Sequence, residues 1–214
     1  MISKLFNNLE SLKLVLNNYS GSAHIKTVAD GKYIYSNDIN VKKFGLNRPE
    51  DIYGLTIKDL NSKMSKRWGS VGDIAHEIEK IVIQSKKEVV DVGRIFLTAN
   101  GLIYKHKMIK IPFFSDGIVT EIITLSENMA DGLPLMELYA LYKSIYSINP
   151  RKGKAIQKFL EHVGIVNYFD ILPTDAELKV LIASKDASTH KETAFILSSS
   201  SKTIDTHLGN LRKK

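Results

Sequence analysis

The sequence predicts an α+β fold in its first 130 residues and an all-α region after them. Five β-rich segments occur in this first part, and helical stretches separate the second segment from the third. Dipeptides typical of hairpin turns, Asp30-Gly31, Asn100-Gly101 and Asp116-Gly117, separate neighbouring β-rich segments. Beyond Leu133 the sequence contains no further strand-like segment. This order favours a five-stranded antiparallel sheet with inserted helices, followed by a helical linker and a helical C-terminal domain.

The boundaries of the elements follow from the spacing of apolar residues. Apolar residues three or four positions apart predict helices, and β-branched runs between turn dipeptides predict strands. Gly45 and Gly54 are the expected stops within the helical stretch that follows the second strand. In chain order we expect a helix, two strands, two helical stretches and three strands, over residues 3–18, 23–29, 32–36, 38–60, 73–86, 88–97, 103–113 and 117–126.

The composition limits the classes of function. The chain has 30 Lys and Arg against 23 Asp and Glu, a net charge of +7 and a pI of about 9.3, which suits an anionic partner such as nucleic acid. It has no cysteine, which excludes disulfides, cysteine-based zinc sites, thiol nucleophiles and cysteinyl-flavin photochemistry. It shows neither a signal peptide nor an apolar run of about 20 residues, so we expect a soluble cytoplasmic protein without a membrane-spanning segment.

The region between the predicted sheet and the C-terminal domain is expected to be a helical linker. Leu135, Leu138, Tyr142 and Ile145 step by three, four and three residues, which is the spacing of a short coiled-coil seam. This seam either mediates dimerisation or packs on the sheet, and the sequence leaves both interpretations open. A second linker helix with one apolar face is expected to end near Gly164.

Capping patterns predict three short helices at the C-terminal end. Thr174 and Glu177 have the spacing of a capping box, in which each side chain bonds the backbone N–H of the other residue. Thr189 and Glu192 repeat this spacing, and Ser200 is placed to cap a third helix. The second and third helices are spaced as a helix-turn-helix requires.

The same residues match a known pattern in order and without a gap. Its opening Thr-x-x-Glu corresponds to Thr174 and Glu177, and its Lys-Glu-Ile-Ala corresponds to Lys191-Glu192-Thr193-Ala194. Its third-helix signature is present as Ser200-Ser-Lys202-Thr203-Ile204-Asp-Thr-His207-Leu208-Gly-Asn210-Leu211. Residues 172–214 therefore resemble the LuxR-type helix-turn-helix. The resemblance implies a third helix that enters the major groove of double-stranded DNA and a role in transcription regulation.

The sequence departs from the LuxR pattern at several positions. The family usually has glycine where Ala187 and Ser198 stand, and a positive φ is the expected reason, so each replacement should cost on the order of 1 kcal/mol. Base contacts in the family come from positions that correspond to Asp205, Thr206 and Gly209. An aspartate cannot bind phosphate but can accept from cytosine N4, and a glycine offers no side chain. Direct base readout is therefore expected to be weak or altered.

The resemblance also implies a set of DNA contacts. We expect lysine and hydroxyl side chains to position the phosphate backbone and two third-helix residues to face bases. The residues of this interface are Lys191, Ser200, Lys202, Thr203, Asp205, Thr206 and Lys213. The family has a fourth helix, used in dimerisation, that would lie beyond Lys214, so the domain is expected to be truncated or to lack this helix.

A second resemblance lies in the predicted α+β region. Its motif begins at Asp30-Gly31-Lys-Tyr-Ile-Tyr35-Ser-Asn37 and continues through Gly45, Glu50-Asp51-Ile52-Tyr-Gly54-Leu-Thr56 and Asp59-Leu60. With the order of strands and helices, these residues resemble a PAS sensory domain over residues 20–130, preceded by an N-terminal helix in residues 1–19. The resemblance implies a cupped sheet that holds a small molecule or pairs with another copy of the domain.

Candidate pocket residues come from the long helix, the segment before it and the facing strands, although for any single one of them a plain core role is favoured. They are Trp68, His76, Ile78, Phe96, Tyr104 and Met108. His76 lies on the helix where haem-binding PAS domains place their iron ligand. A single histidine beside Glu77 is more typical of an exposed helix face, so the sequence does not favour haem, and it leaves the cofactor unknown.

No catalytic set and no phosphate-binding glycine-rich loop are found in the sequence, so we do not expect an enzyme. The leading hypothesis is a homodimeric transcription regulator in which a PAS domain senses a small molecule or partner. Residues 131–171 would then connect it to a LuxR-type DNA-binding domain in residues 172–214. The alternative is a PAS-based protein-interaction module whose degenerate output domain no longer reads DNA, which Asp205 and Gly209 favour.

Overall fold

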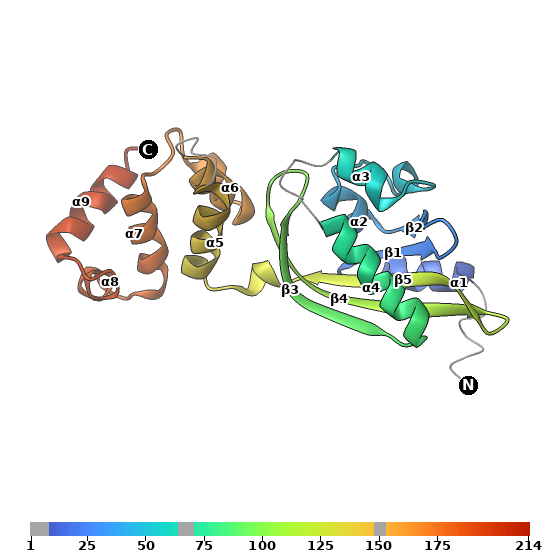
Figure 1. The fold of residues 1–214 in the computed structure, drawn as a ribbon. Helices are drawn as coiled ribbons and strands as arrows, with labels where there is room; N and C mark the ends of the chain where they lie inside the picture. Colours follow the sequence, from blue (N-terminus) through green and yellow to red (C-terminus); the bar gives the residue numbers. More distant parts are fainter. Residues whose placement is uncertain (1–8, 64–70, 148–152) are drawn as a thin grey trace. The chain divides into compact units, whose positions relative to one another are not determined.

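The structure is a computed structural model of the chain and describes residues 9–63, 71–147 and 153–214. It divides into two compact units, unit 1 (Met1–Asp131) and unit 2 (Gly132–Lys214), whose elements are labelled in Figure 1. Among the described residues, no helix combines the length and the apolar character that crossing a membrane requires.

Unit 1 contains the predicted helices and strands in the predicted order. Gly45 and Gly54 have φ values of 72° and 78°, and a short helix ends before each of them, as expected. The elements are α1 (Leu9–Asn17), β1 (Ser22–Thr27), β2 (Tyr33–Ser36), α2 (Asp38–Lys43), the 3-10 helix η2 (Pro49–Ile52), α3 (Ile57–Lys63), α4 (Val71–Ser85), β3 (Val89–Leu97), β4 (Ile103–Ser115), β5 (Ile118–Asn128) and the 3-10 helix η4 (Met129–Gly132).

The strands form one five-stranded sheet in the order β2-β1-β5-β4-β3, and every neighbouring pair is antiparallel. The prediction of an antiparallel α+β sheet with helices after the second strand is therefore confirmed. The turn dipeptides also behave as predicted. Asp116 and Gly117 both have positive φ, 50° and 77°, which is the conformation that a tight type I′ hairpin needs between β4 and β5.

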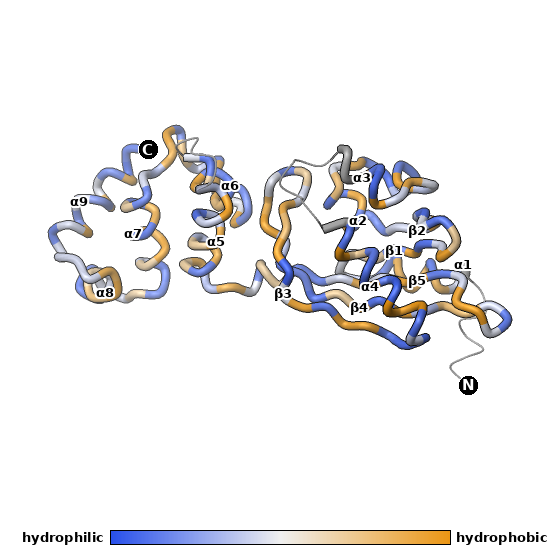
Figure 2. The backbone as a smooth tube through the Cα atoms, in the orientation of Figure 1, coloured by the Kyte–Doolittle hydropathy of each residue, from blue (hydrophilic) through white to orange (hydrophobic). Residues whose placement is uncertain are grey.

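The two faces of the sheet are covered by different helices. Side chains alternate between faces along a strand, and hydrophobic and hydrophilic residues follow one another along β3 and β4 (Figure 2). On one face, Ala23 and Ile25 of β1 pack against Leu12 and Leu16 of α1. On the other face, which we call the inner face, a cluster that includes Phe96 joins the sheet to α2, η2 and α3. The inner face also lies against α4 and carries the cavity described below.

Unit 2 is helical throughout its described residues. Aromatic contacts hold its first two helices together, because the Phe159 ring lies 5.2 Å from Tyr139 and 6.2 Å from Tyr142. The elements are α5 (Leu135–Ser147), α6 (Lys154–His162), the 3-10 helix η5 (Val166–Tyr168), α7 (Asp175–Asp186), α8 (His190–Ile196) and α9 (Ser201–Leu211). The division of this region into a linker, residues 131–171, and a DNA-binding domain, residues 172–214, stays an interpretation of the sequence.

The apolar seam of α5 is used within unit 2. Tyr142, in the middle of the seam, is fully buried, and its hydroxyl lies 2.8 Å from Nδ1 of His162 on α6. Leu138 is buried as well. Neither interpretation left open for the seam included this contact with α6, and dimerisation through the seam stays a prediction. The seam spacing marks an apolar helix face, and α6 supplies a partner for that face from the same chain.

All three predicted caps are present at the starts of α7, α8 and α9. The capping box of Thr174 and Glu177 closes with distances of 3.3 and 2.7 Å, and that of Thr189 and Glu192 with two distances of 3.2 Å. Ser200 Oγ accepts from the backbone N–H of Thr203 at 3.1 Å. Each cap satisfies backbone donors that a helix start leaves without partners.

The expectation of positive φ at both departures from the LuxR pattern is half right. Ser198 has a φ of 49°, so a non-glycine residue stands in the left-handed region there, as predicted. Ala187 has a φ of −96° and a ψ of 136°, which is ordinary extended backbone, so the expected strain at this position is wrong. The chain leaves α7 in an extended conformation, which alanine adopts without cost.

These two positions predict opposite effects of the same kind of substitution. Ser198→Gly relieves a left-handed conformation and should stabilise the helices of unit 2 by on the order of 1 kcal/mol. Ala187→Gly only adds freedom to the unfolded chain and should destabilise them by about 0.4–1 kcal/mol. Native-state amide exchange in α7, α8 and α9 measures both effects. Faster exchange in the Ser198→Gly protein than in the unmodified chain would contradict the proposal that the backbone at Ser198 is strained.

Candidate functional site

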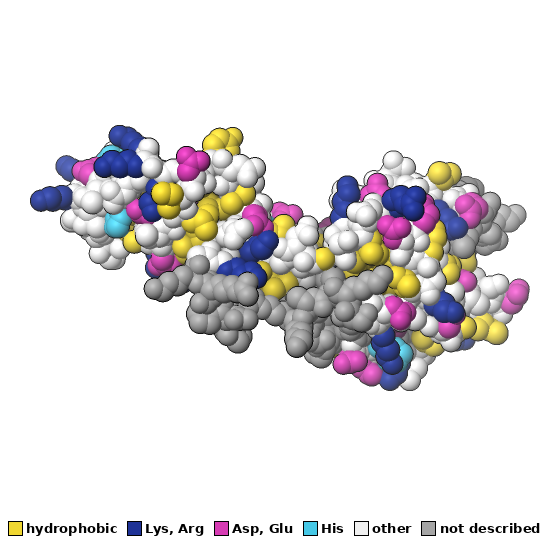
Figure 3. Space-filling model, turned by 90° about the horizontal axis from the view of Figure 1, so that it is seen from above, with side chains coloured by type: hydrophobic (Ala, Val, Ile, Leu, Met, Phe, Trp, Pro, Cys, Tyr) yellow, Lys and Arg dark blue, Asp and Glu magenta, His cyan; other side chains and the backbone are white. Residues whose placement is uncertain are grey.

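The first candidate site is the surface of α8 and α9. The residues predicted to contact DNA are all exposed: Lys191, Ser200, Lys202, Thr203, Asp205, Thr206 and Lys213. Ile204, on the opposite side of α9, is completely buried with Val180 of α7 and Ala194 of α8, and this contact fixes which side of α9 faces outward. Figure 3 shows Lys and Arg side chains on the surface of unit 2.

The lysines of this surface are available, whereas its base-reading positions are partly engaged. No described carboxylate pairs with Lys191, Lys202 or Lys213. Asp205 Oδ1, in contrast, lies 2.5 Å from Nδ1 of His190 on α8.

The hydroxyls of the surface bond within α9. Thr206 Oγ1 donates to the backbone oxygen of Lys202 at 2.9 Å, and Ser200 Oγ lies 2.8 Å from Thr203 Oγ1. Gly209 has no side chain, and open space surrounds the position that a Cβ would take. The surface therefore offers positive charge to a polyanion and few free groups for reading bases.

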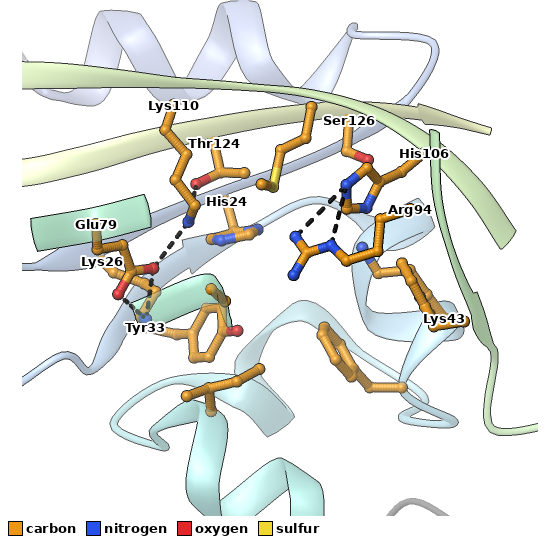
Figure 4. Close-up of a pocket in the computed structure, with 15 residues that line it drawn as sticks. His24, Lys26, Tyr33, Lys43, Glu79, Arg94, His106, Lys110, Thr124 and Ser126 are labelled. Atoms are coloured by element: carbon orange, nitrogen blue, oxygen red, sulfur yellow. Dashed lines mark hydrogen bonds and ion pairs between the residues drawn. The ribbon is translucent and has the colours of Figure 1, made fainter. Parts of the chain in front are cut away.

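The second candidate site is a cavity of about 50 Å³ in unit 1, between the inner face of the sheet and the helices α2 and α4. Figure 4 shows polar side chains from several strands converging on it. The lining residues are His24, Lys26, Tyr33, Lys43, Phe44, Ile57, Ala75, Glu79, Arg94, Phe96, His106, Met108, Lys110, Thr124 and Ser126.

One side of the cavity is closed by a buried carboxylate that two lysines share. Glu79 of α4 accepts from Nζ of Lys26 on β1 at 2.9 Å to each oxygen, and from Nζ of Lys110 on β4 at 2.8 Å. Both lysine side chains are almost completely buried. Burial by itself would raise the pKa of Glu79, but the two lysines outweigh it and hold this pKa below its usual value. The carboxylate is therefore ionised at neutral pH.

The opposite side of the cavity carries a second shared carboxylate. Asp91 Oδ2 lies 2.8 Å from Nη2 of Arg94 and 2.8 Å from Nε2 of His106. Arg94 Nε also lies 3.4 Å from His106 Nε2, so the carboxylate, the guanidinium and the imidazole form one hydrogen-bonded cluster. Burial lowers the pKa of His106 below its usual value and outweighs the hydrogen bond that Asp91 accepts, so this imidazole is neutral at neutral pH.

Between these groups lie a lysine and a histidine without a carboxylate partner among the described residues. Lys43 of α2 donates to Ser22 Oγ at 3.0 Å, and its Nζ lies 5.1–5.7 Å from the ring centres of Phe44, Phe96 and Tyr104. Desolvation, with the like charges of Lys110 and Arg94, lowers the pKa of Lys43 to about 7.

His24 occupies the middle of the cavity wall in Figure 4. Burial, followed by the charges of nearby lysines, lowers its pKa well below the usual value, so the imidazole is neutral. Within the described part of the chain, His24 Nδ1 and Arg94 Nη1 are buried without a hydrogen-bond partner. Unsatisfied buried polar atoms are costly, which makes these two atoms candidates for contact with a ligand or water.

Only some of the predicted pocket residues line the cavity. Phe96 and Met108 line the cavity, and Tyr104 stacks on Phe96 at 5.0 Å behind the wall. His76 is exposed, as expected for a single histidine on a helix surface, and neither it nor Ile78 lines this cavity. Trp68 lies outside the described residues.

Sequence reasoning missed the ionic groups that dominate the cavity. Lys110 stands between two isoleucines and Lys26 follows Ile25, and a lysine that alternates with apolar residues in a strand usually faces solvent. In this sheet both faces are covered, so the polar positions of the alternation are buried beneath α4. Glu79 stands between Ile78 and Lys80 on the predicted long helix and two positions from Glu77, so the sequence does not distinguish it from an exposed helix residue.

The shared carboxylate predicts an asymmetry between two glutamates of α4. Glu79→Gln leaves two buried lysines without their counter-charge and should lower the free energy of unfolding of unit 1 by on the order of 3 kcal/mol. Glu77→Gln is the matched control, since Glu77 is exposed and its ion pair with Lys80 lies on the surface, and it should change little. Urea unfolding of the two variants makes the comparison. Equal stabilities would show that the Glu79 network does not hold α4 on the sheet.

Neither a protein-family model nor a curated protein matches the sequence. Several solved structures are similar to it. The crystal structure of phage VqmA in complex with DPO has 19% sequence identity and a TM-score of 0.52, and the match covers 96% of this chain and 81% of that chain. The Vibrio cholerae VqmA complex with ligand and DNA has 18% identity and a TM-score of 0.49, over 97% of this chain and 80% of that chain.

A third similar structure is a PAS domain alone, that of BvgS from Bordetella pertussis. It has 18% identity and a TM-score of 0.46, and the match covers 64% of this chain and 97% of that domain. The likeness to phage VqmA extends over both units of this chain. The chain thus shares the fold of phage VqmA, an antiparallel α+β unit followed by a helical unit.

Proposed function

We propose that this chain is a DNA-binding transcription regulator in which the PAS-type unit senses a small molecule and controls the helix-turn-helix. The observation that carries the proposal is the surface of α8 and α9. There the capped helices expose Lys191, Lys202 and Lys213, and no described carboxylate neutralises these lysines. Such a surface binds the phosphate backbone and is attracted to DNA by charge.

The roles of single residues follow from their environment. Lys191 and Lys202 contact phosphates, and Ser200 and Thr203 lie at the start of α9, where backbone N–H groups also favour phosphate. Thr206 faces bases only when its hydroxyl leaves the backbone oxygen of Lys202. Asp205 reads a base only when it leaves His190. These costs make binding depend more on backbone contacts than on base contacts.

The sensing role is supported by the cavity and by the shared fold. Phage VqmA, whose fold this chain shares, was solved in complex with DPO. The cavity of unit 1 in this chain lies on the inner face of the sheet and contains buried polar atoms without partners among the described residues. We further propose that the regulator is non-enzymatic, homodimeric and cytoplasmic. Its partners are double-stranded DNA and a small molecule.

The pairing of Asp205 with His190 favours a second candidate function. If the pair persists, α9 presents neither an aspartate nor, at Gly209, any side chain to the bases. The PAS-type unit and the helices would then serve as a protein-interaction module whose output helices do not read a sequence. Salt-insensitive or absent DNA binding distinguishes this function from the first.

The regulator function predicts that Lys202→Ala lowers the affinity for duplex DNA. The full chain should bind duplex DNA with an affinity that falls steeply with salt, and Lys202→Ala should weaken binding to all sequences and reduce the slope of log K against log salt by about one. Lys107→Ala removes the same charge from an exposed site in unit 1 and is the control. Mobility-shift titrations at several salt concentrations give these values. Failure of the full chain to bind even random duplex DNA would refute the function.

A further inference from the structure

We propose that the cavity of unit 1 binds a small monocarboxylate with a short apolar chain, held by Lys43, Arg94 and His24. The proposal deepens the sensing role proposed above. It rests on that role for the consequence of binding, while the binding itself follows from the chemistry of the cavity.

The first argument is the balance of charge. Four cationic side chains line the cavity, those of Lys26, Lys43, Arg94 and Lys110. The described carboxylates that pair with them are Glu79, shared by the two strand lysines, and Asp91, shared by Arg94 and His106. No carboxylate within the described residues is left for Lys43. Against these two carboxylates the four basic side chains leave an excess of two positive charges when Lys43 is ionised. One buried anion reduces this excess and favours the ionised form of Lys43, whose pKa is lowered to about 7 without it.

The second argument is the set of donors left unused. Arg94 bonds Asp91 through Nη2, while Nη1 is buried without a described partner. Lys43 Nζ has three donors and one described acceptor, Ser22 Oγ. His24 Nδ1 is also without a described partner, and a neutral imidazole can carry its proton there. These three groups come from three elements and lie beside one another in Figure 4. The two oxygens of one carboxylate can accept from such a set.

The third argument is the size and chemistry of the walls. A cavity of about 50 Å³ holds roughly three or four water molecules, so a ligand that fits it has few heavy atoms. Phe44, Phe96, Ile57 and Met108 supply apolar walls beside the charged groups. An acid of two to four carbons places its carboxylate on the cations and its chain on these walls. Inorganic phosphate has no apolar part to place on these walls.

The probes are propionate, the neutral isostere propionamide, and inorganic phosphate, each titrated into the full chain at constant ionic strength. Ligand-observed NMR or calorimetry reports the dissociation constants. We expect propionate to bind at least tenfold more tightly than propionamide and phosphate, because only propionate matches both the charge and the walls. Equal binding of propionate and propionamide, tighter binding of phosphate, or no binding of propionate would each overturn the proposal.

A pair of lysine variants locates the site. Lys43→Met removes the lysine that has no described carboxylate partner and should weaken propionate at least tenfold, the equivalent of about 1.4 kcal/mol. Lys42→Met is the matched control, because Lys42 is the exposed neighbour on α2 and should leave the affinity unchanged. Far-UV circular dichroism checks that each variant is folded. If Lys43→Met is unfolded, the comparison of probes on the unmodified chain still decides the proposal.

A mobility-shift assay on the same samples separates this proposal from the regulator function. DNA binding without propionate binding overturns the carboxylate proposal and leaves the regulator function intact. Propionate binding that depends on Lys43, in a chain that does not bind DNA, supports the carboxylate site and refutes the regulator function.

Discussion

The carboxylate of Glu79, shared by Lys26 and Lys110, is the interaction on which the architecture of unit 1 depends. It ties α4 to two strands that are not neighbours in the sheet, since β5 lies between β1 and β4. Burying three charges is expensive, and the arrangement is tolerated only because each lysine bonds the carboxylate and Lys110 also reaches Thr124. The polar residues of the inner face are therefore buried beneath α4. The cavity between them has more basic than acidic side chains for this reason.

What could be predicted from the sequence was local, and what could not was long-range. Hairpin dipeptides and capping boxes act over two to four residues, so the strands, the turns and the starts of α7, α8 and α9 were predictable. The Glu79 network joins residues that lie 53 and 31 positions apart, and no periodicity records such a contact. The lysines obey the alternation of a half-exposed strand, and only the presence of α4 makes them buried.

In unit 2, too, the residues that build the helices were predictable, whereas the contacts of the residues expected to bind DNA were not. Its core of Val180, Ala194 and Ile204 and its caps follow the LuxR pattern, and the structure reproduces them. The residues that would read bases follow the pattern least, and Asp205 is held by His190. At Ser198 the chain keeps the left-handed backbone of the pattern without its glycine, whereas at Ala187 the backbone itself is different. The scaffold of the pattern is therefore kept, and under the proposed function binding to DNA depends more on backbone contacts than on base contacts.

The ionisation of Glu79 tests the central claim most directly. The side-chain carbon-13 shift of its carboxyl group, followed through a pH titration of the folded chain, reports the protonation of this residue alone. If two lysines share the carboxylate, its titration midpoint lies below the ordinary value of 4.5. A midpoint at or above that value would mean that burial dominates, that the carboxylate lacks its two lysines, and that the cavity is not built as described.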